Sequence, residues 1–408
     1  MTTRSLSIGF VTVADLPEGC GRTARLRTLV DALVRMGHRV RIWNQHGLEA
    51  SGAEKISGEI AGARYEYVLG TTSRRRGFQS TWLKIRAVKK ILSELRVAAR
   101  SDELDVVFFN NLAFYDTFPI TLLAQRFRIP TIQCYEDERH EVIDPGRGGL
   151  ARRLFGWNSW AADRWCSPLA NQIWVISSYL QDKYARLSGD ATRVHIIPTI
   201  IDCDAWSMPQ ESARSTPVIL YSGGFGDQDD MEKLICSLGL LKRQNVPFHM
   251  RLLGAKPQLP RVKGLQSLAA ELGLGTMIEF RGFCLSETVK QEIRNANILV
   301  NLRTNSLWSK SGLSTKLSEY LASGRTVLTT DIGDNARYVE NGRSALVVSP
   351  EDSAEKVAET LRNAIEQPAL RKKLGQGARK AALAYFDLPV VQRLMDAALR
   401  GIISKTEN

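Results

Sequence analysis

The chain has 408 residues, enough for two or three domains, and its 44% hydrophobic and 24% charged residues are typical of a globular protein. No apolar run approaches the roughly 18 residues that a membrane-spanning helix needs. The formal charge is +12, and the six cysteines are scattered without a CxxC pair or a Cys/His cluster. We therefore expect no membrane span, no disulfide framework and no zinc site, and we expect a cytoplasmic protein.

The chain opens with a strand, a glycine loop, a helix and a second strand. Residues 6–13 are apolar and are interpreted as a strand rather than a signal peptide. A helix at 22–36 and a strand at 38–43 follow. This order predicts a Rossmann-like unit, in which Gly21 of the Gly19-Cys-Gly21 loop lies near the ligand.

The positive charge is concentrated between Arg64 and Arg100, where ten basic and two acidic residues give a net charge of +8. Within 82–92, apolar residues recur at helical spacing and lysines and arginines surround them. Two interpretations remain open. Residues 74–92 could lie on an anionic membrane surface, or they could form a core-packed helix with a solvated basic face. No motif for RNA or DNA accompanies the charge, so we expect no nucleic-acid partner.

Four carboxylates and a histidine follow the strand predicted at 131–134, in the run Tyr135-Glu136-Asp137-Glu138-Arg139-His140-Glu141. Ligands of parallel sheets bind beyond the carboxyl ends of the strands. A carboxylate there could orient an acceptor hydroxyl or act as its base. Glu136 and Asp137 are therefore candidate catalytic residues, and a solvated acidic loop is the alternative.

A polar, proline-bearing stretch at 205–217 predicts a linker, and a second α/β series begins after it. The strand at 218–221 leads into the glycine loop 222–226, whose amides can approach phosphate oxygens. Two doubly wound α/β domains with a cleft between them fit this pattern best. The further elements of the second series are predicted at 230–244, 248–253, 264–272, 277–281 and 286–294.

The segment 311–331 is the most informative part of the chain. After a strand at 297–302 it predicts a small-residue loop, a short amphipathic helix and a strand at 326–330. The amides at the start of this helix predict an anion site, Lys316 adds a positive charge, and Glu319 is an acceptor one turn deeper. This set suits a nucleoside diphosphate, with phosphates on the amides and ribose hydroxyls on the carboxylate. An ordinary capped helix with an i,i+3 Lys–Glu pair is the alternative.

This segment resembles the donor-binding helix of glycosyltransferase family 4, in the variant that reads Gly-x-x-x-Lys-Leu-x-Glu-Tyr-x-Ala-x-Gly-x-Pro-Val. The resemblance covers nearly the whole chain and implies the GT-B fold, two Rossmann-like domains facing a central cleft. It implies an acceptor domain at 1–204, a linker at 205–217, a donor domain at 218–386 and a helix at 387–408 that packs back on the first domain. The matching residues are Gly312, Lys316, Leu317, Glu319, Tyr320, Ala322, Gly324 and Val327.

The resemblance further implies a retaining, metal-independent transfer from a nucleoside-diphosphate sugar, which is a substrate and not a cofactor. The implied acceptor is lipid-linked or a cell-surface polysaccharide, which would place the protein peripherally on the inner face of the cytoplasmic membrane. The catalytic candidates are Lys316, Asp137 and Glu136. The candidates for donor binding are Gly21, Gly223, Gly224, Phe283, Gly312, Leu313, Ser314, Thr315 and Glu319.

The chain departs from the family pattern at several positions. Gly224 stands where an Arg is common, and residues 228–230 stand where a Lys is common. Gly312 replaces the first Glu of a Glu-x7-Glu pair, and Arg337 stands where Glu is frequent. Two other hypotheses therefore stay open: a non-catalytic sugar-nucleotide-binding scaffold, and a GT-B epimerase or phosphorylase.

Overall fold

The computed structural model describes residues 4–19, 21–45, 55–71, 78–101, 103–110, 113–138, 150–206, 216–254 and 258–406. Cys20, the arginines at 74–76, His140, Glu141 and most of the predicted linker lie outside these ranges. The chain forms two compact units, and each is described by itself. Unit 1 comprises Met1–Ile200 and Val391–Asn408, and unit 2 comprises Ile201–Val390.

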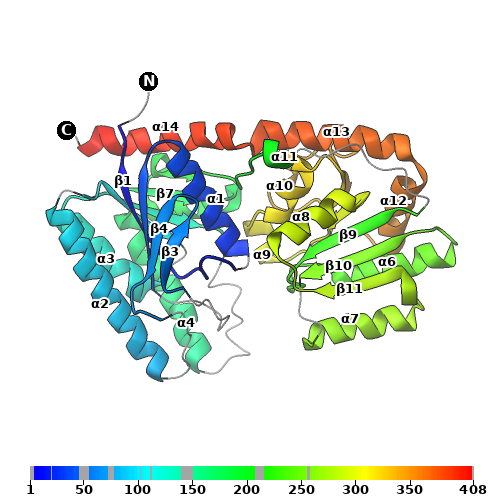
Figure 1. The fold of residues 1–408 in the computed structure, drawn as a ribbon, viewed down its shortest axis with the longest axis horizontal. Coiled ribbons are helices and arrows are strands. Elements are labelled where there is room, and N and C mark those ends of the chain that lie inside the picture. Colours follow the sequence, from blue (N-terminus) through cyan, green and yellow to red (C-terminus); the bar gives the residue numbers. More distant parts are fainter. Residues whose placement is uncertain are drawn as a thin grey trace. The chain divides into compact units, whose positions relative to one another are not determined.

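The described part of unit 1 contains an eight-stranded sheet in the order β3-β4-β2-β1-β5-β6-β7-β8, parallel except for the β3–β4 pair (Figure 1). Every residue of β1 is buried, because helices cover both faces of the central strands. The strand order reverses between β1 and β5, which is where ligands bind in open sheets of this kind. The strands are β1 Ser7–Thr12, β2 Arg39–Asn44, β3 Ser57–Ile60, β4 Ala63–Tyr67, β5 Val106–Asn110, β6 Thr131–Tyr135, β7 Gln172–Val175 and β8 Val194–Ile196.

Helices α2 and α3 pack on one face of this sheet. Ile91 and Leu95 of α2 and Ile120 of α3 share a buried cluster with Val11 and Phe109 of the strands. The last helix, α14, also belongs to unit 1. The helices of unit 1 are α1 Gly21–Arg35, α2 Phe78–Arg100, α3 Phe114–Arg126, α4 Leu150–Ala161, α5 Ser178–Ser188 and α14 Leu388–Thr406, with a π-helical turn η1 at Ala162–Cys166.

Two glutamines bind α14 to the rest of unit 1. Gln392 Nε2 donates to the Ala32 carbonyl of α1 at 3.1 Å, and Gln172 Nε2 of β7 donates to the Ala398 carbonyl at 2.5 Å. Among the helices that the structure describes, none is long and apolar enough to cross a membrane.

Unit 2 contains a fully parallel six-stranded sheet in the order β11-β10-β9-β12-β13-β14, counted over its described residues. Its order reverses between β9 and β12, so the residues that follow these two strands meet at one edge. The strands are β9 Val218–Gly223, β10 His249–Gly254, β11 Ile278–Gly282, β12 Ile298–Asn301, β13 Thr326–Thr330 and β14 Leu346–Val348.

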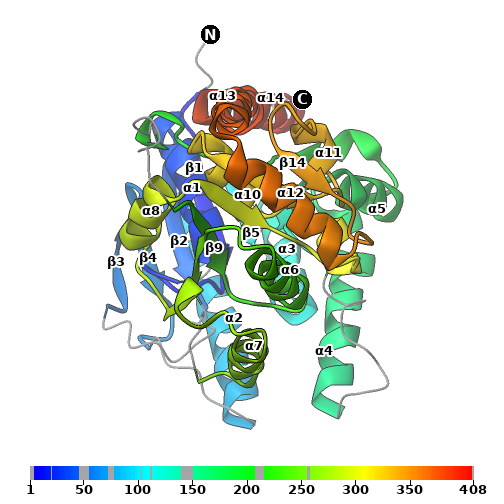
Figure 2. The ribbon, with the colours of Figure 1, turned by 90° about the vertical axis from the view of Figure 1, so that its right-hand side faces the viewer.

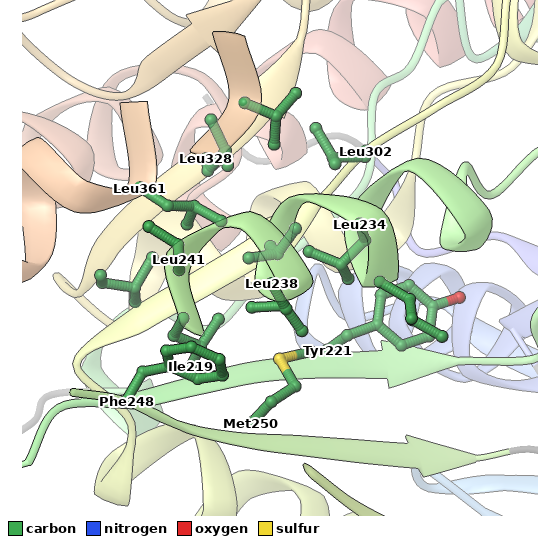
Figure 3. Packing of buried hydrophobic residues seen from close by; sticks show 14 of the residues in the cluster. Ile219, Tyr221, Leu234, Leu238, Leu241, Phe248, Met250, Leu302, Leu328 and Leu361 are labelled. Carbon is green, nitrogen blue, oxygen red and sulfur yellow. The ribbon is translucent and has the colours of Figure 1, made fainter. Parts of the chain in front are cut away.

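The core of unit 2 explains why the loop after β9 is held in place. Leu234, Leu238 and Leu241 of the first helix of this unit pack on Ile219 and Met250 of the strands, and all five side chains are buried (Figure 3). The helices of unit 2 are α6 Met231–Arg243, α7 Pro260–Glu271, α8 Ser286–Asn295, α9 Leu307–Ser311, α10 Thr315–Ala322, α11 Asn335–Tyr338, α12 Ala354–Glu366 and α13 Pro368–Tyr385 (Figure 2).

The predicted α/β class is confirmed, and most predicted strands and helices match within one to two residues. The hairpin β3–β4 and the helices α3 and α4 were not predicted from the sequence. The helix α10 begins at Thr315 and ends before Gly324, whose φ of 67° suits glycine.

Candidate donor site at the switch point of unit 2

The strand β9 ends at Gly223, and the side chain of Lys316 packs against it. A Cβ atom on Gly223 would lie 2.6 Å from Lys316 Nζ and would also meet the Tyr221 hydroxyl. Glycine is therefore required at position 223 to admit the lysine. A Cβ on Gly224 would meet nothing within 4 Å, so packing within the unit does not explain glycine there.

Lys316 lies in the first turn of α10, and its ammonium is held by three groups. Nζ is 2.8 Å from Asp229 Oδ1, donates to the Tyr221 hydroxyl at 3.1 Å, and lies 4.4 Å from the centroid of the Tyr221 ring. The alternative of an i,i+3 pair with Glu319 is therefore wrong. Burial lowers the pKa of Lys316, and the Asp229 carboxylate opposes that shift.

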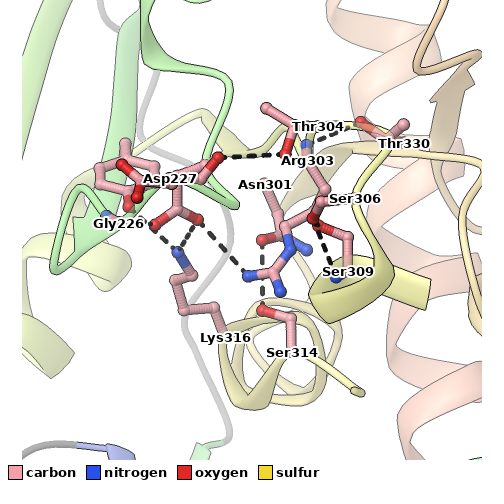
Figure 4. Close-up of polar contacts among 12 residues, drawn as sticks. Gly226, Asp227, Asn301, Arg303, Thr304, Ser306, Ser309, Ser314, Lys316 and Thr330 are labelled. Carbon is pink, nitrogen blue, oxygen red and sulfur yellow. Dashed lines mark hydrogen bonds and ion pairs between the residues drawn. The ribbon is translucent and has the colours of Figure 1, made fainter. Parts of the chain in front are cut away.

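Asp229 is the centre of the cluster, since its side chain is only 2% exposed and faces two cations. Arg303 Nη1 lies 3.5 Å from the same Oδ1 atom, and the Gly226 amide donates to Oδ2 at 3.2 Å (Figure 4). Burial alone would favour the neutral acid, but Lys316 and Arg303 hold the pKa of Asp229 below its usual value. The cluster of these three charged residues is called the Asp229 cluster below.

The loop after β9 is fixed from outside the Asp229 cluster. Arg261 of α7 contacts Asp227 Oδ1 at 2.7 Å and donates to the Asp229 carbonyl at 3.2 Å. Thr304 Oγ1 donates to the Asp227 carbonyl at 3.1 Å. The glycine loop thus has a defined conformation without a ligand, which lowers the entropic cost of binding one.

Arg303 was missed by the sequence analysis. It follows β12 by two residues, its amide donates to Thr330 Oγ1 at 2.9 Å, and it forms an isolated antiparallel bridge with Asp229. The available signal was a basic residue just beyond a strand at the edge where the strand order reverses. Residues 228–230, which stand where the family often has a lysine, instead contain the counter-ion of two cations.

Glu319 lies one turn after Lys316 and is partly buried. Burial raises its pKa to about 7, and the positive charge of Lys316 opposes the shift. Among the described residues, none donates a hydrogen bond to its carboxylate or forms an ion pair with it. The next residue, Tyr320, is buried, and its hydroxyl accepts from the Ser222 amide at 2.9 Å, which ties α10 to the end of β9.

The loop before α10 contains four of the predicted donor-binding residues. The Gly312 amide donates to the Trp308 carbonyl at 3.2 Å, so it already has a partner within the chain. The amides of Leu313, Ser314 and Thr315 form no hydrogen bond with any residue that the structure describes. The Ser314 hydroxyl donates to Asn301 Oδ1 at 3.2 Å. Three consecutive amides at the start of a helix can therefore accept an anion.

Two predicted donor-binding residues lie apart from the Asp229 cluster. Phe283 follows β11, two strands from β9, and is 65% exposed. Gly21 is the first residue of α1 in unit 1. Neither contacts a residue of the cluster in the described part of the structure.

The two predicted catalytic carboxylates belong to unit 1 and follow β6 directly. Asn110 Nδ2, at the end of the neighbouring strand β5, donates to Glu136 Oε1 at 3.3 Å. Asp137 is partly buried. Both residues therefore lie at the edge of the sheet where the sequence placed them.

Glu138, the next residue, has a different environment. It is 2% exposed, and Lys183 Nζ contacts its two carboxylate oxygens at 2.6 and 2.7 Å. The same Nζ lies 2.7 Å from Asp163, which also accepts from the Tyr184 hydroxyl at 2.7 Å. The interpretation of this loop as a solvated acidic segment is thus wrong for Glu138, which is part of a buried ion network. Within the described residues, no group of three His, Cys, Asp or Glu side chains is placed to hold a metal ion.

Two protein-family descriptions match the chain, one in each half. Residues 21–199 match the glycosyl transferase 4-like domain, and residues 204–381 match the glycosyl transferases group 1. The chain is 22% identical over 179 residues to the putative glycosyltransferase EpsD of Bacillus subtilis, which is 44% of each protein. It is 31% identical over 124 residues to the D-inositol 3-phosphate glycosyltransferase of Streptomyces avermitilis, which is 30% of this chain and 25% of that one. The matched segments therefore span less than half the length of these curated relatives.

Solved structures of similar fold cover nearly the whole chain. The sucrose-phosphate synthase of Thermosynechococcus elongatus has a TM-score of 0.75 at 17% identity, over 98% of this chain and 99% of that one. HepE of Anabaena, in complex with UDP and glucose, has a TM-score of 0.70 at 17% identity, over 97% and 99%. WaaG, a glycosyltransferase involved in lipopolysaccharide biosynthesis, has a TM-score of 0.68 at 16% identity, over 96% and 98%. With both halves matched and the GT-B fold confirmed, the chain belongs to the GT4-like, group 1 family of glycosyltransferases.

Proposed function

We propose that this protein is a retaining, metal-independent glycosyltransferase. It transfers a sugar from a nucleoside-diphosphate sugar to a lipid-linked or cell-surface glycan acceptor. The observation that carries this proposal is the Asp229 cluster, which holds two cations beside three consecutive amides at the start of α10.

The charges of the site suit a diphosphate. Asp229 keeps Lys316 and Arg303 close together, where the two cations would otherwise repel each other. A diphosphate brings more negative charge than the single carboxylate and can also accept from the amides of Leu313 to Thr315. Positive charge fixed on the leaving diphosphate stabilises the transition state for breaking the sugar–phosphate bond.

Arg303 addresses one departure from the family pattern. The family often supplies an arginine from the position of Gly224, and here Arg303 supplies a guanidinium from the next strand of the sheet. Glu319 replaces only half of the Glu-x7-Glu pair, because Gly312 occupies the first position. Its carboxylate is suited to accept from the ribose hydroxyls of the donor.

Binding energy and reaction chemistry are thus assigned to different units. Lys316 and Arg303 stabilise the leaving group, and Asp137, assisted by Glu136, orients the acceptor hydroxyl or accepts its proton. Two similar proteins support a surface-glycan acceptor, because WaaG acts in lipopolysaccharide biosynthesis and HepE binds UDP. The basic helix α2, with Arg86, Lys89 and Lys90 exposed, supports a peripheral position on the inner face of the cytoplasmic membrane.

A thermal-shift screen in EDTA against UDP, GDP, ADP and their common sugar conjugates tests the donor assignment. A ligand that binds only the folded protein raises the unfolding midpoint by mass action. UDP is the first ligand to test, since HepE binds it. A shift with one nucleoside diphosphate, followed by sugar transfer to a glycolipid acceptor, is the expected result. Binding without transfer would favour the scaffold, and an epimerised sugar formed without acceptor would favour the epimerase.

A further inference from the structure

Unit 1 exposes a group of large apolar side chains on α4 and η1. Trp157 is 51% exposed, Trp160 and Trp165 are each 42% exposed, and Leu154 is 57% exposed. These four residues are called the tryptophan face. Tryptophan is a highly buried residue on average, and contiguous exposed apolar groups mark sites of interaction.

The tryptophan face is an ordered surface. The rings of Trp157 and Trp160 lie 6.1 and 5.5 Å from that of Trp165, and Phe114 of α3 lies 5.3 Å from Trp165. On the other side of α4, Ala161 is completely buried. The helix therefore has a fixed rotation, with its apolar core face inward and a second, aromatic face outward.

The surroundings of the tryptophan face are basic. Residues 78–100, 114–126 and 150–166 contain ten lysines and arginines and three acids. Glu94 contacts Arg41 and Lys90, Asp163 contacts Lys183, and Asp116 is 2% exposed. The acids are thus neutralised or buried, and the charge presented to solvent by these helices is positive.

Helices α2 and α4 reach the same side of unit 1. Both contact α3 between them: Lys84 of α2 lies 5.4 Å from the centroid of the Tyr115 ring, and Asn158 of α4 accepts from the Tyr115 amide at 3.2 Å. Figure 1 and Figure 2 both show α2 and α4 projecting downward from the sheet of unit 1. The exposed Trp82 and Ile85 near the start of α2 add to the apolar groups of this side.

We propose that the tryptophan face inserts into the interfacial layer of an anionic phospholipid bilayer. Tryptophan is enriched at that depth, because its ring is apolar and its N–H is polar. The exposed Arg86 and Lys89 of α2 contact the lipid headgroups, and Arg164 of η1 does so from the tryptophan face itself. This inference deepens the membrane association in the proposed function and identifies the side chains that enter the bilayer.

Sedimentation with phosphatidylcholine vesicles, with and without phosphatidylglycerol, tests the insertion. The variant carries Leu154→Ser and Trp160→Ser, and the control carries Leu285→Ser, a leucine of unit 2 with 58% exposure against 57% for Leu154. We expect the control to bind anionic vesicles like the wild type, and the double variant to bind about tenfold more weakly. Equal binding of the double variant and the wild type would overturn the insertion.

Two further arms separate the ways in which the result could fail. Lipids with a quencher near the headgroup should quench tryptophan fluorescence of the bound wild type, and bound protein without quenching contradicts insertion. If the wild type binds no vesicle, insertion fails, and the UDP thermal shift then shows whether the donor site stands without it. If the wild type dimerises and the double variant does not, a second copy covers the face and the bilayer assignment is wrong. Unfolding midpoints of all proteins report whether the substitutions disturb the fold.

Discussion

The carboxyl edges of the two sheets use similar residues in different ways. In unit 2, one buried carboxylate, Asp229, faces two cations, and three amides beside them make no internal hydrogen bond. In unit 1, one buried cation, Lys183, faces two carboxylates, Glu138 and Asp163. The first arrangement has positive charge to offer to a ligand, whereas the second satisfies its own charges within the fold.

This comparison teaches that charge at a sheet edge is not by itself evidence of a site. Both clusters lie beside strands and both consist of acids and bases. They differ in the sign of the excess charge and in whether hydrogen-bonding groups remain for a ligand. Only the edge of unit 2 combines positive excess, amides and the lone acceptor Glu319.

The largest effect is expected for Lys316→Ala. Removal of a charged group that stabilises the leaving diphosphate should lower kcat/KM about 10²–10³-fold, measured with the donor that the nucleotide screen identifies. Lys263→Ala, an exposed lysine of α7, is the matched control and should leave kcat/KM unchanged. Near-wild-type turnover of the Lys316 variant would remove this residue from the catalytic machinery.

Lys183→Met tests the opposite role of the cluster in unit 1. The substitution leaves two buried carboxylates without their cation and should lower the free energy of unfolding by about 3–5 kcal/mol, measured by urea denaturation. Affinity for the nucleoside diphosphate should not change, because the site lies in unit 2. Lys356→Met, which breaks an exposed pair with Glu359, should cost less than about 1 kcal/mol. Equal costs for the two substitutions would contradict a structural role for the buried network.

Asp229→Asn separates structure from binding within unit 2. Without its carboxylate, Lys316 and Arg303 repel each other, and we expect a loss of about 3 kcal/mol in unfolding free energy. A bound diphosphate should restore part of that loss, so its thermal shift should be larger in the variant than in the wild type. Asp227→Asn is the control, since Asp227 pairs with Arg261 at 94% side-chain exposure. A smaller ligand-induced shift in the Asp229 variant would mean that the diphosphate does not occupy the cluster.

The pH dependence of stability tests the state of Glu319. Its pKa is raised from 4.5 to about 7, so the folded protein favours the protonated carboxyl. The stabilisation is complete below pH 4.5, declines as the pH rises through about 7, and amounts to about 3 kcal/mol at most.

Glu319→Gln should therefore flatten the decline between pH 4.5 and 7, measured by denaturation at several pH values. Asp116 of unit 1, whose pKa burial also raises to about 7, titrates in both proteins and cancels in the difference. Glu340→Gln, at an exposed pair with Arg343, is the control. Parallel curves for wild type and the Glu319 variant would show that Glu319 is ionised in the folded protein at low pH as usual.

The sequence predicted much of the fold because its signals are local. Apolar runs marked the central strands, and Gly37 and Gly324 marked helix ends with φ values of 88° and 67°. The hairpin β3–β4 was missed because its strands are short, with several exposed positions. In α4, the outward face is aromatic, which weakens the amphipathic pattern that identifies a helix.

The site was predicted only in part, for a physical reason. Lys316, Glu319 and Gly223 are recognised within one loop or one helix turn. The relation of Arg303 to Asp229 depends on a bridge between residues 74 positions apart, which periodicity does not reveal. A residue counted as a departure from the family pattern, Asp229, is the counter-ion that places both cations.

Isothermal titration in EDTA of the wild type and Arg303→Gln with UDP, UMP and the other nucleoside diphosphates tests the central claim, that the Asp229 cluster binds the donor diphosphate. We predict that one nucleoside diphosphate binds the wild type more tightly than its monophosphate, and that Arg303→Gln weakens the diphosphate about tenfold and the monophosphate much less. Equal affinity of the variant and the wild type for that diphosphate, or no binding of any nucleoside diphosphate, would contradict it.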